Sequence, residues 1–109
     1  MRARPPRKRR RSASARYVLR LYVAGGTSRS LRAIDNLRRI CEEHLGGRYD
    51  LQVIDIYRQL PLARGEQIVA VPTLIKKLPE PLRRLIGDMS DKKRVLMGLD
   101  LRPQTRERP

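Results

Sequence analysis

The chain has 109 residues, and its 26 lysines and arginines against 11 acidic residues give a net charge of +15. This length predicts one small domain, and no uninterrupted apolar run approaches the ~20 residues needed to span a bilayer. A single cysteine and a single histidine exclude an internal disulfide and a four-ligand zinc site. The cysteine and histidine counts favour a reducing, cytoplasmic setting, and no cofactor or metal is expected.

The basic residues gather at the chain ends. Residues 1–16 hold eight of them and no acid, together with proline and serine. This composition predicts a disordered basic N-terminal arm, and nucleic acid is an expected partner only through this arm. Residues 102–109 are expected to form a C-terminal tail, which leaves 17–101 as the folded domain. Without tryptophan or phenylalanine the core of this small domain is marginal, so self-association to a dimer or tetramer is a natural remedy.

The first half of the domain predicts a strand, a helix and a second strand. Tyr17–Ala24 is β-branched and aromatic and closes at two glycines, which is typical of a central strand. Tyr49–Ile56 is the second strand. Between them, after a cap at Thr27 or Ser28, apolar residues recur at helical spacing up to Gly46-Gly47: Leu31, Ile34, Leu37, Cys41 and Leu45. Such a β-α-β unit has a right-handed crossover and parallel strands.

The second half leaves alternatives open. Pro61 favours a short helix through Ile68, whereas Glu66–Val71 also fits an extended segment. Val71-Pro72-Thr73 leads into a short strand, and Leu82–Ile86 fits a strand or a short helix. Residues 90–101 fit two patterns. One is a helix that is capped by Ser90 or Asp91 and carries Val95, Leu96 and Leu99 on one face, and the other is a strand with alternating apolar residues.

The chemistry of a thioredoxin-like enzyme is missing from this sequence. A β-α-β start followed by Val71-Pro72-Thr73 is typical of thioredoxin-like domains, in which the proline before the third strand is commonly cis. The turn after the first strand, where thioredoxins carry two cysteines, reads Ala24-Gly-Gly-Thr-Ser-Arg-Ser30. Thiol exchange therefore has no nucleophile at this turn, and no catalytic residues are expected elsewhere in the chain.

An ordered set of motifs resembles the KaiB family of circadian clock proteins. It comprises Tyr17-Val-Leu-Arg-Leu-Tyr-Val-Ala-Gly25, Val53-Ile-Asp-Ile56, Ala70-Val-Pro-Thr-Leu74, Arg83-Arg-Leu-Ile-Gly-Asp88 and Lys93-Arg-Val-Leu-Met-Gly-Leu-Asp-Leu101. The resemblance implies a non-enzymatic timing protein that binds a KaiC-like hexameric ATPase, with KaiA or a clock-output histidine kinase as further partners. The residues implied at the partner surface are Leu60, Arg64, Gln67, Lys76 and Arg84. Gln52 and Gln67 stand where cyanobacterial members tend to carry lysine, a departure from the family pattern at or near the surfaces that meet these further partners.

The resemblance also implies an α/β fold whose second half has two arrangements. A thioredoxin-like β-α-β core is kept, while the whole chain reads βαββααβ in a self-associated ground state and βαβαββα in a thioredoxin-like monomer. Pro72, Gly98 and Asp100 are the residues expected to govern this change. Gly98 weakens a helix or a strand, whereas Asp100 is disfavoured within the strand but falls at the exposed end of the helix. The alternatives to a clock protein are a basic nucleic-acid-associated protein and, less favoured, a thioredoxin-like enzyme.

Overall fold

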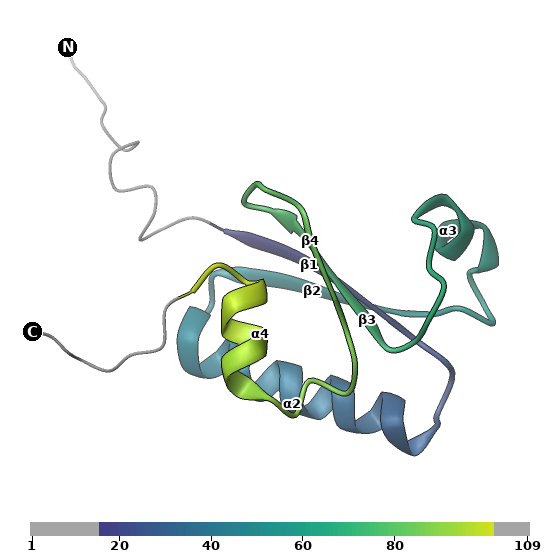
Figure 1. The fold of residues 1–109 in the computed structure, drawn as a ribbon, viewed down its shortest axis with the longest axis horizontal. Coiled ribbons are helices and arrows are strands. Elements are labelled where there is room, and N and C mark those ends of the chain that lie inside the picture. Colours follow the sequence, from purple (N-terminus) through teal and green to yellow (C-terminus); the bar gives the residue numbers. More distant parts are fainter. Residues whose placement is uncertain (1–15, 102–109) are drawn as a thin grey trace, which may run out of the picture.

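The structure of the protein is a computed structural model that describes residues 16–101. In chain order the elements are β1 (Tyr17–Val23), α2 (Ser28–Leu45), β2 (Tyr49–Asp55), α3 (Leu60–Gly65), β3 (Thr73–Leu78), β4 (Arg83–Ile86) and α4 (Lys92–Gly98). This order is βαβαββα, the second of the two arrangements that the resemblance implies (Figure 1). Residues 1–15 of the predicted arm and the tail at 102–109 lie outside the described residues. Arg16 lies within them and pairs with Asp50 of β2 at 3.1 Å.

The four strands form one mixed sheet in the order β2-β1-β3-β4. β1 runs parallel to β2, with Tyr17 opposite Tyr49 and Val23 opposite Asp55, which confirms the predicted parallel pair of strands. β3 returns antiparallel along the other side of β1, and β4 pairs antiparallel with β3. β2 and β4 are therefore the two edges of the sheet.

Helix α2 is capped as the sequence predicts, but its buried face is shifted. The Thr27 hydroxyl accepts a hydrogen bond from the Ser30 amide at 3.3 Å, and Gly46, at φ 59°, ends the helix. The prediction that Leu31 belongs to the buried face is wrong, because 55% of Leu31 is exposed. At about 100° per residue, Ser30 and Ala33 lie near Leu37 on the helix surface, whereas Leu31 lies about 120° away.

In the second half, each segment that the sequence left open adopts one of its two expected structures. A short helix forms at α3 after Gln59, and Glu66–Val71 contains no strand. Leu82–Ile86 contains strand β4, and residues 92–98 form helix α4 rather than a strand. Asp91 supplies the cap, since its carboxylate accepts a hydrogen bond from the Arg94 amide at 3.2 Å. The interpretation of this segment as a helix with Val95, Leu96 and Leu99 buried is confirmed for this arrangement.

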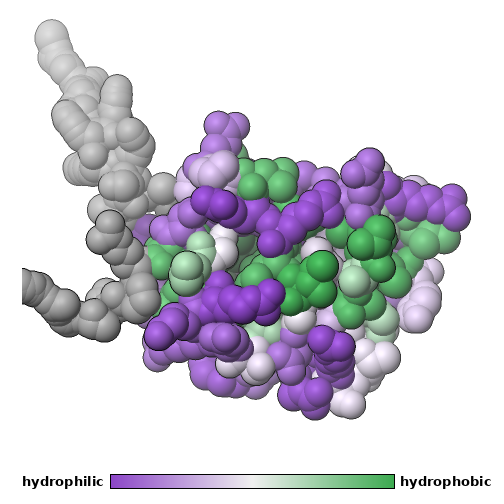
Figure 2. All heavy atoms as spheres, viewed as in Figure 1, coloured by the Kyte–Doolittle hydropathy of each residue, from purple (hydrophilic) through white to green (hydrophobic). Residues whose placement is uncertain are grey.

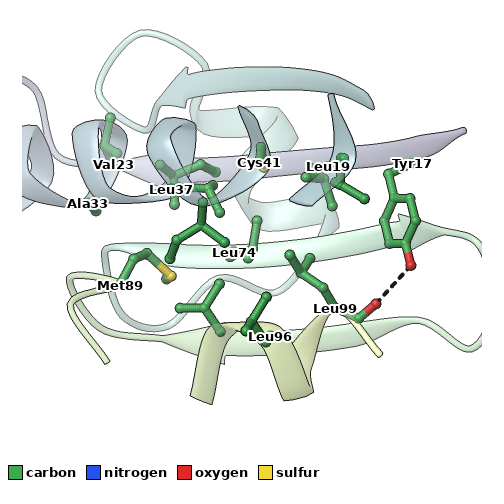
Figure 3. Close-up of a cluster of buried hydrophobic side chains, with 14 residues drawn as sticks. Tyr17, Leu19, Val23, Ala33, Leu37, Cys41, Leu74, Met89, Leu96 and Leu99 are labelled. Carbon is green, nitrogen blue, oxygen red and sulfur yellow. Dashed lines mark hydrogen bonds between the residues drawn. The ribbon is translucent and has the colours of Figure 1, made fainter. Parts of the chain in front are cut away.

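The two faces of the sheet bury separate apolar clusters. Tyr17, Leu19, Leu21 and Val23 of β1 point to the face that α2 and α4 cover, where they form the larger cluster (Figure 3). Tyr22 points to the opposite face and packs with side chains under α3: Ile54, Ala63 and Ile75. Strand alternation therefore divides the core between the long helix on one side and the short α3 on the other.

Candidate partner-binding surface

Helix α3 and the chain that follows it enclose an apolar hollow of about 310 Å³. Pro61 lies in the first turn of this six-residue helix, and Ala63 anchors the helix by packing with Ile75 and Ile54 of the sheet. The amide of Ile68 donates to the Ala63 carbonyl at 3.0 Å, which folds the following chain back against the helix. The hollow is lined by Ile56, Leu60, Ala63, Arg64, Ile68, Val69, Ala70 and Val71. Figure 2 shows hydrophobic residues gathered on this part of the molecule, with hydrophilic residues beside them.

Leu60 and Arg64 line this hollow, and Gln67 lies beside it, with its backbone amide donating to the Arg64 carbonyl at 3.0 Å. That these residues bind a partner stays a prediction. Leu60 is 46% exposed, and the side chains of Arg64 and Gln67 are also exposed. Gln67 adopts φ 57°, a left-handed conformation at the turn that leaves α3. Arg84 of β4 lies next to these residues, because its guanidinium donates a hydrogen bond to the backbone carbonyl of Glu66 at 2.6 Å. These four residues share one side of the fold.

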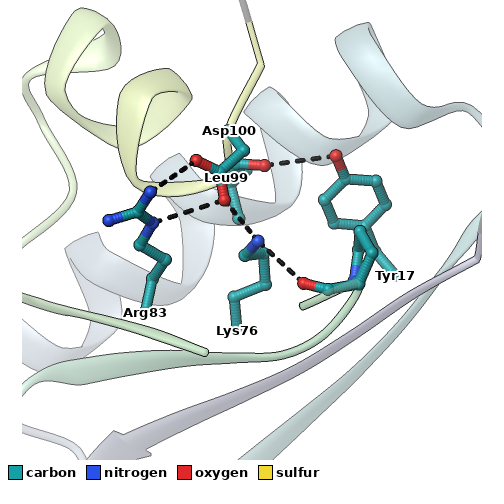
Figure 4. A network of polar contacts seen from close by, with 6 residues as sticks. Tyr17, Lys76, Arg83, Leu99 and Asp100 are labelled. Atoms are coloured by element: carbon teal, nitrogen blue, oxygen red, sulfur yellow. Dashed lines mark hydrogen bonds and ion pairs between the residues drawn. The ribbon is translucent and has the colours of Figure 1, made fainter. Parts of the chain in front are cut away.

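Lys76 does not lie on this surface, so the expectation that it contributes to the partner surface is wrong for this arrangement. Only 1% of Lys76 is exposed. Its ammonium lies on the opposite side of the sheet, where it donates to the Asp100 carboxylate and to the Pro79 carbonyl (Figure 4). The reason is strand alternation, which sends the side chain of Lys76 to the face opposite that of Ile75.

Asp100 is the centre of a polar network that fixes the end of α4. Its carboxylate pairs with Lys76 and with Arg83, at 3.1 Å from the guanidinium, and these hydrogen bonds lower the pKa of Asp100. Beside it, the Tyr17 hydroxyl donates to the Leu99 carbonyl at 3.1 Å (Figure 4). The network joins β1, β3 and β4 to the chain that leaves α4, and Asp100 holds a positive φ of 61° within it.

The turn after β1 forms a fixed scaffold that lacks a reactive thiol. Gly25 turns at φ 56°, and its amide donates to the Asp55 carboxylate at 3.2 Å. The Val71–Pro72 peptide bond is cis, as expected for a thioredoxin-like domain. Cys41 is buried on α2, where desolvation raises the pKa of its thiol to about 12. At neutral pH this thiol is therefore protonated and shielded from solvent.

Val69 and Tyr57 are exposed apolar residues that the sequence reasoning missed. Val69 lines the hollow and is 90% exposed, and Tyr57, two residues before the cap of α3, is 74% exposed. Tyr57 falls in a connection, and Val69 falls in Glu66–Val71, which the sequence left open as an extended segment. The available signal was Val69 itself, because a β-branched residue outside any strand has no sheet to bury it and is a candidate for an exposed apolar patch.

The described residues contain neither a cluster of metal-ligating side chains nor a helix that could span a membrane. Within residues 16–101, His, Cys, Asp and Glu side chains nowhere gather in the threes that hold a metal ion. The helices of the same residues are all too short or too polar to cross a membrane.

Solved structures with the same architecture define the class of this domain as thioredoxin-like. The N-terminal domain of SasA from Synechococcus elongatus matches with a TM-score of 0.69 and 17% identity, over 98% of this chain and 97% of that one. The germline-specific thioredoxin Deadhead from Drosophila melanogaster matches with a TM-score of 0.62 and 14% identity, over 83% and 86%. At these identities the likeness concerns the fold alone.

The chain belongs to the KaiB family. The KaiB domain profile matches residues 20–101. The circadian clock protein KaiB3 of Synechocystis is 52% identical over 89 residues, which cover 82% of this chain and 87% of that protein. The circadian clock oscillator protein KaiB of Prochlorococcus marinus (strain MIT 9312) is 52% identical over 90 residues, covering 83% and 86%. These relatives support a role in a circadian clock and partners among clock proteins.

Proposed function

We propose that the protein is a timing factor that binds a KaiC-like hexameric ATPase through the surface around α3. The observation that carries the proposal is the apolar hollow, which leaves Leu60 and Val69 open to solvent beside the Arg64 guanidinium. Apolar anchors within a charged border are typical of protein interfaces. Membership of the KaiB family supplies the class of partner.

The protein acts by binding and not by catalysis. The turn that carries two cysteines in thioredoxins has none here, and the Cys41 thiol is buried with its pKa raised to about 12. Neither place offers a nucleophile for thiol exchange at neutral pH. The place of action is the cytoplasm, in keeping with a chain that has one free cysteine.

The thioredoxin-like arrangement is one of two that the chain adopts, and it is the monomer that binds the ATPase. The other is a self-associated ground state, a dimer or tetramer in which the second half is rebuilt. Residues 90–101 support this because they satisfy the spacing of a strand as well as that of α4. KaiA or a clock-output histidine kinase completes the set of partners, although Gln52 and Gln67 depart from the lysines of cyanobacterial members.

Association kinetics with a purified KaiC-like ATPase, in ATP and in ADP, test the docking surface. The full-length double variant Arg64→Glu/Arg84→Glu should bind about tenfold or more weakly and associate more slowly, because charge reversal opposes the encounter with an acidic partner surface. The matched control is Arg38→Glu/Arg39→Glu, which makes the same charge change on exposed residues of α2. Equal affinity and on-rate for wild type and the first variant would contradict the proposal, as would an equal loss in the control.

A further inference from the structure

We infer that the free edge of β4 is a second docking site, which takes an acidic, extended segment of a partner protein as an added strand. The site, called here the β4 edge, consists of the outer side of Arg83–Ile86 together with Arg29 and Arg94 beside its end. The two sites share only Arg84, which contributes its side chain to the α3 surface and its backbone to the β4 edge, so the inference stands whether or not the hollow at α3 binds an ATPase.

The backbone of β4 offers outward-facing groups in the geometry of a strand edge, of which only the Ile86 carbonyl accepts a bond from a described residue. The Gly87 amide donates inward to the Pro72 carbonyl at 3.0 Å. Because successive residues of a strand alternate, Ile86 and Arg84 direct their amide and carbonyl groups away from β3. The Ile86 carbonyl confirms this direction, since its one contact is a long 3.5 Å bond from the Arg94 guanidinium. Among residues 16–101 no strand pairs with this side of β4.

Beside this edge three arginines, Arg29, Arg32 and Arg94, stand against two aspartates, Asp88 and Asp91, which leaves one positive charge uncompensated. A hollow of about 340 Å³ lies at the end of β4, and Arg29 and Arg94 contribute to its lining. Arg29 is exposed and makes no hydrogen bond or ion pair with any described residue. The two acids of the hollow are already engaged: Asp88 pairs with Arg32 at 3.5 Å, and Asp91 caps α4.

These two features together select a peptide with acidic side chains. Carboxylates on alternate residues of an added strand would point to one face, within reach of the arginines, while its backbone pairs with Arg84 and Ile86. A nucleic acid fits less well, because phosphates supply acceptors only and leave the outward carbonyls without donors. The opposite edge, β2, carries Asp50 and Asp55, so charge distinguishes the two edges of the sheet.

The test uses the full chain and a short fluorescein-labelled peptide of alternating glutamate and valine. Fluorescence polarisation should show binding that is lost when the peptide backbone is N-methylated or when glutamate is replaced by lysine. Arg94→Glu should weaken binding about tenfold, and Arg38→Glu on α2 is the matched control that should leave it unchanged. Position 94 lies in the first turn of α4, where an acidic residue favours the helix, so Arg94→Glu is expected to fold.

Amide hydrogen exchange followed by NMR locates the contact on the backbone. On peptide binding, exchange should slow at Arg84 and Ile86, while the amides along the outer face of α2 stay unchanged. Ile86→Pro removes an outward donor without touching a β3 bond, and it should abolish binding. Equal binding of the N-methylated peptide, or an equal effect of Arg94→Glu and Arg38→Glu, would overturn the proposal. So would an oligodeoxythymidine that binds as tightly as the glutamate peptide, because the arginines would then attract polyanions in general.

Discussion

Breaking the ion pair between Lys76 and Asp100 should strongly destabilise this arrangement, and Asp100→Asn breaks it with little other change. Asparagine accepts the positive φ of 61° that Asp100 adopts, so the backbone is preserved. The substitution removes the negative charge that faces the ammonium of Lys76, which is 1% exposed, and leaves only neutral acceptors: the Pro79 carbonyl and the new amide oxygen. The variant therefore isolates the cost of a buried, uncompensated charge.

The expected loss is about 2 kcal/mol in the free energy of unfolding. Removing one partner of a fully buried pair costs about 3–5 kcal/mol, and the one-third exposure of the Asp100 side chain reduces this by about half. In urea unfolding followed by far-UV circular dichroism, the midpoint should fall by about 1–2 M at an m-value of about 1–1.5 kcal/mol/M. The pKa of Asp100 is lowered in the folded state, so its contribution is present above about pH 4 and is lost as the pH falls through the folded pKa. The acid limb of the stability profile should be shallower in Asp100→Asn.

Three comparison variants make the result decisive. Lys76→Met should cost less than Asp100→Asn, because methionine fills the space while Asp100 keeps Arg83 and solvent. Adding Lys76→Met to Asp100→Asn should recover most of the lost stability, and this is a coupling that a double-mutant cycle measures. Asp50→Asn, which breaks an exposed pair with Arg16, is the surface control. A midpoint for Asp100→Asn within error of wild type, or no recovery in the double variant, would refute the reasoning.

Three further changes test other parts of the fold. Gly98→Ala places a methyl group 3.4 Å from the side chain of Leu85 and gains about 0.5–1 kcal/mol in helix propensity. The variant should therefore have a higher melting temperature or, where two arrangements interconvert, a larger monomer fraction in size-exclusion light scattering. No change in either measurement would contradict this prediction. Leu37→Ala should cost about 2–5 kcal/mol in denaturant unfolding, whereas Leu31→Ala should leave stability nearly unchanged, and similar losses would mean that the buried face of α2 is misplaced. The Cys41 thiol, with a pKa of about 12, should react with a disulfide reagent at pH 8 far more slowly than in the urea-unfolded chain, and equal rates would show that it is accessible.

Short-range patterns were enough to predict the first half of the fold. β1, α2 and β2 are each long enough to show a period, and Thr27 and Gly46 mark the ends of the helix. The face of α2 was misjudged at Leu31 because a large apolar residue weighs more in a pattern than Ser30 and Ala33, which are small and buried. Helix periodicity alone cannot correct this, since the phase is set by what the helix packs against.

The second half depends on contacts between distant segments, which explains why the sequence left it open. α3, β4 and α4 have six, four and seven residues, too few for a period to decide between helix and strand. Asp100 holds α4 in place through Lys76, which lies 24 residues earlier in the chain. The same separation hid the burial of Lys76, because a lysine in a strand is expected to be exposed until its partner is known.

Hydrogen–deuterium exchange by mass spectrometry on the complex with a KaiC-like ATPase tests the central proposal most directly. Full-length protein, with and without the ATP-bound hexamer, would be compared peptide by peptide. The account predicts slower exchange in residues 56–71, where Leu60, Arg64 and Val69 surround the hollow, and unchanged exchange along the exposed side of α2. Protection confined to α2, with 56–71 exchanging as in the free protein, would contradict the assignment of the docking surface to α3.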